Sequence, residues 1–217
     1  MNKEIPLKHD LPSSKFSEHY YADVSSYMGR RVELIETWGL SLLPGDSILE
    51  LGCGDGFLLG LLAERGFTCY GLDYSEGMVE ASRQRCHGLI SPMNIWQGDL
   101  NDQYFLEKLP ERIDCAVSFR TFDLYCHNWV GALKVLRSVV SKKVVIDIDP
   151  RRRPLGDLLQ AFREAGFLKV NWRPFFVPQK KKLGTIGLHL LRTLENVPGA
   201  RWALLQVKFT ALVKGEI

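Results

Sequence analysis

Four residues at alternate positions have the types and spacing of a ligand-binding turn. They form the run Glu50-x-Gly52-x-Gly54-x-Gly56, directly after a short apolar stretch that predicts a buried strand. Residues 57–65 then have the composition of a helix. A strand that turns through glycines into a helix lets a ligand approach the main chain and meet the unpaired N–H groups of the first helical turn. We therefore expect a binding site at this turn.

The spacing of the glycines and a second acid narrow the class of ligand. A dinucleotide fingerprint, G-x-G-x-x-G, would have its third glycine at position 57, which is a phenylalanine here. A second predicted strand, residues 68–73, ends on Asp73. An acid about 20 residues beyond a glycine turn is placed to accept hydrogen bonds from ribose hydroxyls. A nicotinamide oxidoreductase is thereby disfavoured; the alternative role of Asp73 is to cap the helix that follows.

Glu50 with its three glycines resembles the first motif of the class I S-adenosylmethionine-dependent methyltransferases. Residues 74–78 end on a methionine and resemble the start of the second helix of that family, where a Met commonly lies against adenine. Residues 98–100, Gly-Asp-Leu, resemble its adenine-contacting turn, although Asp99 also suits a turn without a ligand. The order and the distances of these motifs make the resemblance specific.

The resemblance also implies roles for residues outside the motifs. Residues 15–40 have a helical pattern with an aromatic stripe, and in the family a Tyr here often reaches the cofactor carboxylate or roofs the substrate pocket. Packing of this helix on the sheet is the alternative. The implied cofactor is S-adenosylmethionine, and the implied cofactor-binding residues are Tyr21, Glu50, Gly52, Cys53, Gly54, Gly56, Asp73, Tyr74, Met78, Gly98, Asp99, Leu100 and Ser118.

Short apolar strands alternate with amphipathic helices along most of the chain. Such alternation predicts an α/β fold with an open parallel sheet between helices. The last two predicted strands, residues 167–172 and 204–214, resemble the closing hairpin of the methyltransferase family, whose last strand is antiparallel. We expect a Rossmann-like, doubly wound, mostly parallel seven-stranded sheet with an antiparallel last strand and helices on both faces.

We expect a single methyltransferase domain with four parts. These are an N-terminal helical cap (1–42), a cofactor-binding core (43–173), an insertion or lid (174–202) and the last strand (203–217). The last strand is expected to have one solvated face, because apolar and polar residues alternate in it: Leu205, Val207 and Phe209 against Gln206, Lys208 and Thr210.

The insertion carries three lysines, residues 180–182, before a predicted helix that is apolar along Ile186, Leu190, Leu191 and Leu194. Three interpretations are open. The helix packs on the domain, or it forms a lid over the substrate, or it makes a peripheral contact with a membrane surface. In the resembled family, such additions usually carry the substrate specificity.

Composition sets the broad class of the protein. The chain has 217 residues, of which 46% are hydrophobic and 24% charged, as in one soluble globular domain. The net charge of +3 is too small to indicate nucleic acid. Five cysteines without a CxxC spacing predict reduced, mostly structural thiols and a cytoplasmic location. The sequence lacks an apolar signal core and a run of about 20 apolar residues, so no transmembrane segment is expected, and the scattered histidines predict no metal site.

Methyl transfer from a sulfonium is an in-line displacement by the nucleophile of the acceptor. Alignment and exclusion of water are the main tasks of the protein, and no catalytic residue is strictly required. For a hydroxyl acceptor a general base helps, and Asp123 and His127 lie just after the fourth predicted strand, residues 113–118. Arg120 and the run 151–153 are candidates for recognising a phosphate or carboxylate, or form a solvated surface.

Missing motifs narrow the acceptor. Base-amino methyltransferases of the superfamily have a Pro-Pro-aromatic motif after the fourth strand, where this chain has Phe119-Arg120-Thr121. A Pro-Cys loop and the paired glutamates of protein arginine enzymes are also missing. A small-molecule or lipid-like acceptor is therefore expected and nucleic acid is disfavoured. An RNA methyltransferase and a non-catalytic S-adenosylmethionine-binding protein remain alternatives, and the oligomeric state is not predicted.

Overall fold

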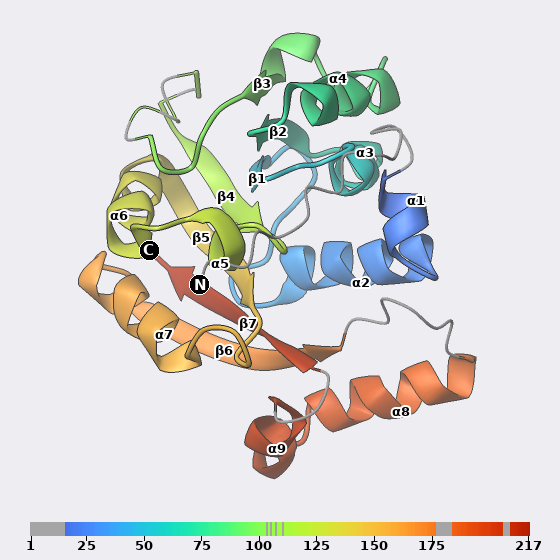
Figure 1. The fold of residues 1–217 in the computed structure, drawn as a ribbon, viewed down its shortest axis with the longest axis vertical. Helices are drawn as coiled ribbons and strands as arrows, with labels where there is room; N and C mark the ends of the chain where they lie inside the picture. The colour runs from blue at the N-terminus through green and yellow to red at the C-terminus, as the bar shows by residue number, and fades with distance from the viewer. Residues whose placement is uncertain are drawn as a thin grey trace, which may run out of the picture.

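The computed structural model describes residues 16–102, 104, 106, 108–109, 111–176, 184–205 and 209–217. Its centre is one seven-stranded sheet of order β3-β2-β1-β4-β5-β7-β6 (Figure 1). The strands are β1 (Ser47–Leu51), β2 (Thr68–Asp73), β3 (Ile95–Gln97), β4 (Ile113–Ser118), β5 (Val140–Ile148), β6 (Lys169–Phe176) and β7 (Phe209–Glu216). The helices are α1 (Phe16–Tyr20), α2 (Val24–Thr37), α3 (Phe57–Glu64), α4 (Glu76–Arg85), α5 (Phe122–Tyr125), α6 (Trp129–Val139), α7 (Leu155–Glu164), α8 (Thr185–Glu195) and α9 (Arg201–Leu205).

The sheet is parallel except around its last strand. β1 pairs in parallel with β2 and β4, and the β2–β3 and β4–β5 pairs are also parallel. β7 runs antiparallel to both of its neighbours, β5 and β6. The predicted Rossmann-like sheet with an antiparallel last strand is therefore confirmed.

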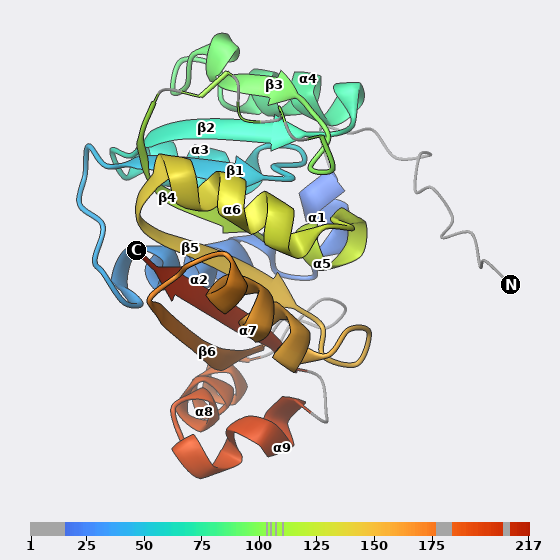
Figure 2. The same ribbon diagram turned by 90° about the vertical axis from the view of Figure 1, so that its left-hand side faces the viewer.

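Helices cover both faces of this sheet (Figures 1 and 2). Successive side chains of a strand point to opposite faces, so the two faces of β1 belong to different parts of the core. Ile48 lies in a cluster with side chains of α2 and α3, whereas Leu49 lies in a cluster with side chains of α6 and α7. Strands buried on both faces must be apolar throughout, which explains the short apolar runs in the sequence.

The expected solvated face of the last strand is wrong. β7 lies between β5 and β6, and its residues 210–216 are buried on both faces, including the polar Thr210, Lys214 and Glu216. The ammonium group of Lys214 donates to the carboxylate of Glu216 (2.6 Å), which also accepts the N–H of Leu40 (3.0 Å) after α2. Of the three polar residues expected to face water, Thr210 is buried, and Gln206 and Lys208 lie outside the described residues.

The bounds of the last two strands also differ from the prediction. β6 extends to Phe176, so residues 174–176 belong to the sheet and not to an insertion. Leu205 ends α9, and β7 begins at Phe209. The lysines at 180–182 and the first 15 residues lie outside the described residues. The division into four parts otherwise stays a prediction, and no described helix is long and apolar enough to span a bilayer.

Gly215 of β7 provides a test of this packing. A Cβ at this position would collide with the ring of Phe162 and would lie 2.7 Å from the ring of Phe167. We expect Gly215→Ala to lower the free energy of unfolding by about 1–3 kcal/mol through overpacking, measured by urea denaturation. Gly156→Ala in α7 is the control, since a Cβ there meets no atom within 4 Å. An equally stable Gly215→Ala variant would contradict the packing of β7 against these rings.

Candidate functional site

The three glycines after β1 adopt left-handed conformations, with φ of 75° at Gly52, 56° at Gly54 and 75° at Gly56. A side chain at Gly52 would collide with Thr121, and one at Gly56 would come within 2.9 Å of the Cα of Ser82 in α4. At Gly54, by contrast, a Cβ would meet nothing within 4 Å. The turn is therefore packed closely at both ends and open in the middle, directly before the N-terminus of α3.

Asp73 links this turn to the loop after β2. Its carboxylate accepts the N–H of Gly54 on one oxygen and the N–H of Ser75 on the other, each at 2.9 Å. Burial raises the pKa of Asp73, and the bonds from Ser75 and Gly54 oppose that shift. The next loop joins the same place, since the N–H of Gly98 donates to the carbonyl of Asp73 (3.0 Å). The loops after three neighbouring strands thus meet at Asp73, two of them at its carboxylate and the third at its main-chain carbonyl.

The short helix α1 is fastened to the glycine turn through Asp55. The carboxylate of Asp55 is buried and accepts both the N–H (2.9 Å) and the hydroxyl (2.6 Å) of Ser17. Arg85 of α4 bridges the same carboxylate (3.2 Å) to that of Glu18 (2.9 Å). Helix α1 therefore covers the edge of the glycine turn.

A buried arginine of α2 lies between two strand ends on the same face of the sheet. The guanidinium of Arg31 is 4.2 Å from the ring centre of Tyr27 and 4.3 Å from that of Phe119. It donates to the hydroxyl of Tyr27 and to the sulfur of Met28 (3.4 Å). Its Nε has no hydrogen-bond partner among the described residues. A buried, incompletely bonded guanidinium is costly unless a ligand completes it.

Two buried carboxyl groups accompany Arg31. Burial raises the pKa of Glu50 in β1 to about 8 and that of Asp147 in β5 to about 6, with Arg31 opposing both shifts. Glu50 Oε2 and Asp147 Oδ2 have no partner within the described part of the chain. The other oxygen of Asp147 accepts the N–H of Arg120 (2.6 Å), which holds Arg120 at a φ of 61°. Such a left-handed conformation is uncommon for a residue other than glycine.

Residues 48–143, which include this turn, match the family model described as "Methyltransferase domain". This segment, less than half of the 217 residues, is therefore similar to a methyltransferase domain. A "Ubiquinone biosynthesis O-methyltransferase" of Pseudomonas fluorescens (strain Pf0-1) is 32% identical over 72 residues. That alignment covers 33% of this chain and 30% of the enzyme. The first curated relatives are thus matched over less than a third of their length.

Solved structures of methyltransferases share the fold of the whole domain. A SAM-dependent methyltransferase from Aquifex aeolicus aligns with a TM-score of 0.61 at 14% identity, over 95% of this chain and 99% of that one. Magnesium protoporphyrin IX methyltransferase (ChlM) from Synechocystis PCC 6803, solved with bound SAM, aligns with a TM-score of 0.58 at 17% identity. That alignment covers 89% of this chain and 81% of ChlM.

The remaining predicted cofactor residues divide into two groups. Tyr74 is exposed and Met78 half-buried at the start of α4, beside the turn that contains Asp99 and the buried Leu100. Tyr21, Cys53 and Ser118 are buried in the domain instead. Their polar groups are engaged locally or face the core: Ser118 Oγ donates to the carbonyl of Leu51 (2.9 Å), Cys53 Sγ lies 3.9 Å from Ser82 Oγ, and Tyr21 packs 4.5 Å from the ring of Tyr27.

The two predicted catalytic residues have different surroundings. Asp123 of α5 is buried, its carboxylate accepts the N–H of Asp149 (3.1 Å), and burial raises its pKa. His127 is exposed. Its main-chain N–H donates to the side-chain oxygen of Asn101 (2.8 Å), which lies two residues after Asp99. The predicted pair is thus divided between the end of β5 and the turn after β3.

Two residues of the site, Arg31 and Asp147, are not among those predicted from the sequence. Arg31 occupies an apolar position of the α2 periodicity, four residues after Tyr27 and four before Ile35. Asp147 interrupts the apolar end of β5. A charged residue at a position that the pattern assigns to the core was the available signal.

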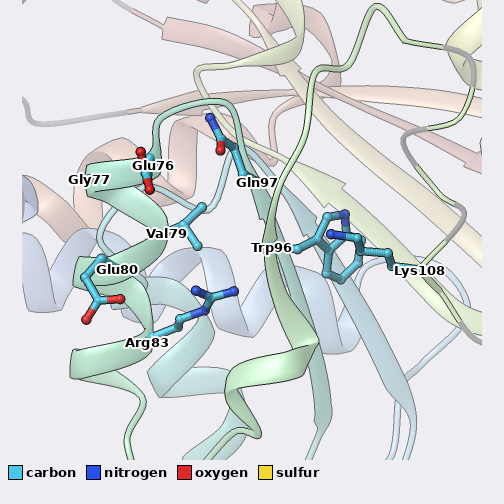
Figure 3. Close-up of a pocket in the computed structure, with 8 residues that line it drawn as sticks. All are labelled: Glu76, Gly77, Val79, Glu80, Arg83, Trp96, Gln97 and Lys108. Atoms are coloured by element: carbon cyan, nitrogen blue, oxygen red, sulfur yellow. The ribbon is translucent and has the colours of Figure 1, made fainter.

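One described pocket, of about 530 Å³, lies outside the glycine turn, between α4 and the edge strand β3 (Figure 3). Its sides come from α4 on one hand and from Trp96 and Lys108 on the other. It contains none of the residues predicted to bind the cofactor. Its full lining is Glu76, Gly77, Val79, Glu80, Arg83, Trp96, Gln97 and Lys108.

The raised pKa of Glu50 predicts a pH dependence of stability. Its folded value, about 8, lies above the ordinary 4.5, so the folded state holds a proton that the unfolded state releases. The free energy of unfolding therefore falls as pH rises through this window. Glu50→Gln mimics the protonated carboxyl group and removes the effect. From about pH 6 to about pH 8 we expect the native protein to lose about 2 kcal/mol relative to this variant in urea unfolding without cofactor.

The exposed Glu64→Gln in α3 is the control and should follow the native protein at every pH. If Glu50→Gln shows the same pH dependence as the native protein, Glu50 is ionised in the fold and the assigned shift is wrong.

Proposed function

We propose that the protein binds S-adenosylmethionine and transfers its methyl group to a small-molecule or lipid-like acceptor. The observation that carries the proposal is the glycine turn held by Asp73 at the N-terminus of α3, within the segment that matches the methyltransferase domain. The nicotinamide alternative has less support. The dinucleotide fingerprint requires its third glycine at position 57, and in this chain Phe57 stands there as the first residue of α3.

The chemistry of the turn fits this cofactor. The open side of Gly54 admits a ligand to the main chain, and each oxygen of Asp73 retains a lone pair for a ribose hydroxyl. The unpartnered atoms of Glu50 and Arg31, among the described residues, complement the ammonium and carboxylate of an amino acid moiety. Tyr74, Met78, Asp99 and Leu100 would then flank the adenine. When bound, the cofactor supplies an activated methyl group on a sulfonium.

The chain itself aligns the reactants and removes water and a proton. Tyr21 and Tyr27 form an apolar cover on α2 and the segment before it, and the tie between Ser17 and Asp55 holds α1 over the turn. We propose Asp123 and His127 as acid–base residues for a hydroxyl acceptor. Burial and a raised pKa support Asp123 better, because a general base works best when its pKa approaches the working pH.

The names of two similar proteins support a lipid-like acceptor. The names of two relatives place them in ubiquinone biosynthesis and on magnesium protoporphyrin IX, which supports an apolar acceptor for this chain. Peripheral contact with a membrane fits such an acceptor, and a cytoplasmic location remains a prediction. RNA methylation and cofactor binding without catalysis are the alternatives that the experiments below separate.

Asp73→Asn tests the cofactor site. The substitution removes the charge that would bind the ribose hydroxyls, so we expect S-adenosylmethionine and S-adenosylhomocysteine to bind about 10- to 100-fold more weakly in calorimetry. NAD should not bind to either protein. Asp114→Asn is the control. Asp114 also accepts a main-chain N–H, from Ser47 (2.9 Å), but it lies at the amino ends of the strands, away from the glycine turn. Unchanged affinity in a folded Asp73→Asn variant would mean that Asp73 supports only the turn.

Transfer of a tritiated methyl group to cell extract tests the acceptor class. We expect the label in the small-molecule or organic-soluble fraction, and loss of that label with Asp73→Asn. Label in RNA alone would favour the RNA alternative, and no label in any fraction would favour a binding protein. With the labelled acceptor, Asp123→Asn should lower kcat/KM by about 100-fold at unchanged cofactor affinity, and His127→Gln much less. The reverse order of the two effects would assign the base to His127.

A further inference from the structure

Helix α8 leaves a row of apolar side chains exposed. Helices on the surface of a globular protein turn an apolar stripe to the core and charged residues to water. Among the described side chains of α8, Glu195 is buried and Leu191 packs partly buried against the core. Ile186, Leu190 and Leu194, spaced four residues apart along one side, are exposed by 79%, 59% and 42%.

The inward face of α8 is held by charge. Glu195 accepts hydrogen bonds from Arg30 of α2 (3.2 Å), from Arg173 of β6 (3.2 Å) and from the N–H of Phe176 (2.9 Å). A buried carboxylate with two arginines and a main-chain donor fixes the rotation of the helix, because turning it would leave these charges unpaired. The apolar side is therefore held facing away from the domain.

The next helix, α9, also has an exposed apolar side chain. α8 and α9 lie together beyond the β6 edge of the sheet, in both views of the fold (Figures 1 and 2). Trp202 of α9 packs edge-on against Trp172 of β6 at 4.7 Å between ring centres, yet 60% of it is exposed. A tryptophan anchored on one side and open on the other is typical of residues at a membrane–water interface.

The charge of this part of the chain indicates what covers the apolar surface. Between β6 and β7 the sequence has one acid, Glu195, and six basic residues: Lys180, Lys181, Lys182, Arg192, Arg201 and Lys208. Glu195 is buried and paired, so it does not offset the positive charge of Arg192 on α8 and Arg201 on α9. Two copies of such a surface would repel each other, whereas anionic lipid headgroups would attract it.

We propose that the outer face of α8, with Trp202 of α9, binds the surface of an anionic lipid bilayer. Apolar side chains enter the acyl boundary while basic residues meet the headgroups, as in interfacial amphipathic helices. This rests on the proposed function in one respect: the bilayer is where the enzyme meets a lipid-like acceptor. Vesicle binding is measured without methyl transfer, so the two proposals can fail separately.

The first test is co-sedimentation with vesicles of phosphatidylcholine and phosphatidylglycerol. The native protein should sediment with them, should bind pure phosphatidylcholine weakly and should be released by salt. The variant Leu190→Glu with Leu194→Glu should bind at least about 10-fold more weakly. The control is Leu89→Glu with Met93→Glu, which alters two exposed apolar residues and the net charge equally, near β3 at the opposite edge of the sheet. Both variants should keep the native Tm and bind S-adenosylmethionine.

A second measurement does not depend on loss of binding. All five cysteines are buried, so a Leu190→Cys variant accepts an environment-sensitive dye selectively at position 190. Its emission should shift to the blue on anionic vesicles, and that of a labelled Leu89→Cys variant should not. The proposal is overturned if the native protein ignores anionic vesicles, if the α8 variant binds them equally, or if the dye does not respond. A native dimer that the α8 variant dissociates would assign the surface to a second copy instead.

Discussion

The hydrogen bonds from Gly54 and Ser75 to Asp73 hold the loops of the candidate site together. β1 and β2 are parallel neighbours, so their carboxyl ends meet at one edge of the sheet, and one carboxylate reaches both loops. The glycine turn keeps its left-handed geometry because Asp73 fixes its centre while α4 and the loop after β4 confine its ends. The position of α3, and the direction of its unpaired N–H groups, follow from this constraint.

Beside the turn, the fold keeps charges buried at a considerable energetic cost. Arg31, Glu50 and Asp147 lie on the face of the sheet that α2 covers, and burial shifts the pKa of both carboxyl groups upward. A domain selected for stability alone would place apolar residues there. Unsatisfied atoms of both signs in one place are instead suited to a zwitterionic ligand, and α1, fastened to Asp55, closes the same edge.

The opposite strategy appears at the far edge of the sheet. There the carboxylate of Glu195 accepts hydrogen bonds from Arg30 and Arg173, and the apolar side chains on the other side of α8 are exposed. The same physical rule explains both places, since charges are tolerated in the interior when their partners are present. Near the glycine turn one oxygen of Glu50 and one of Asp147 have no partner among the described residues, whereas at α8 both oxygens of Glu195 accept hydrogen bonds. One place is therefore suited to a small polar ligand, and the other to an apolar surface.

The local pattern of the sequence determined the strands, the glycine turn and the order of the motifs, because buried parallel strands and left-handed turns restrict residue type at each position. It also indicated Asp73 and the fold class. Only the tertiary structure decided the burial of Lys214 and Glu216, since a strand with alternating polarity has the same sequence whether its polar side faces water or the end of α2. Likewise the periodicity of α8 marked an apolar stripe without its direction. Which side faces the domain depends on Arg30 and Arg173, residues from distant elements that meet Glu195 only in the folded chain.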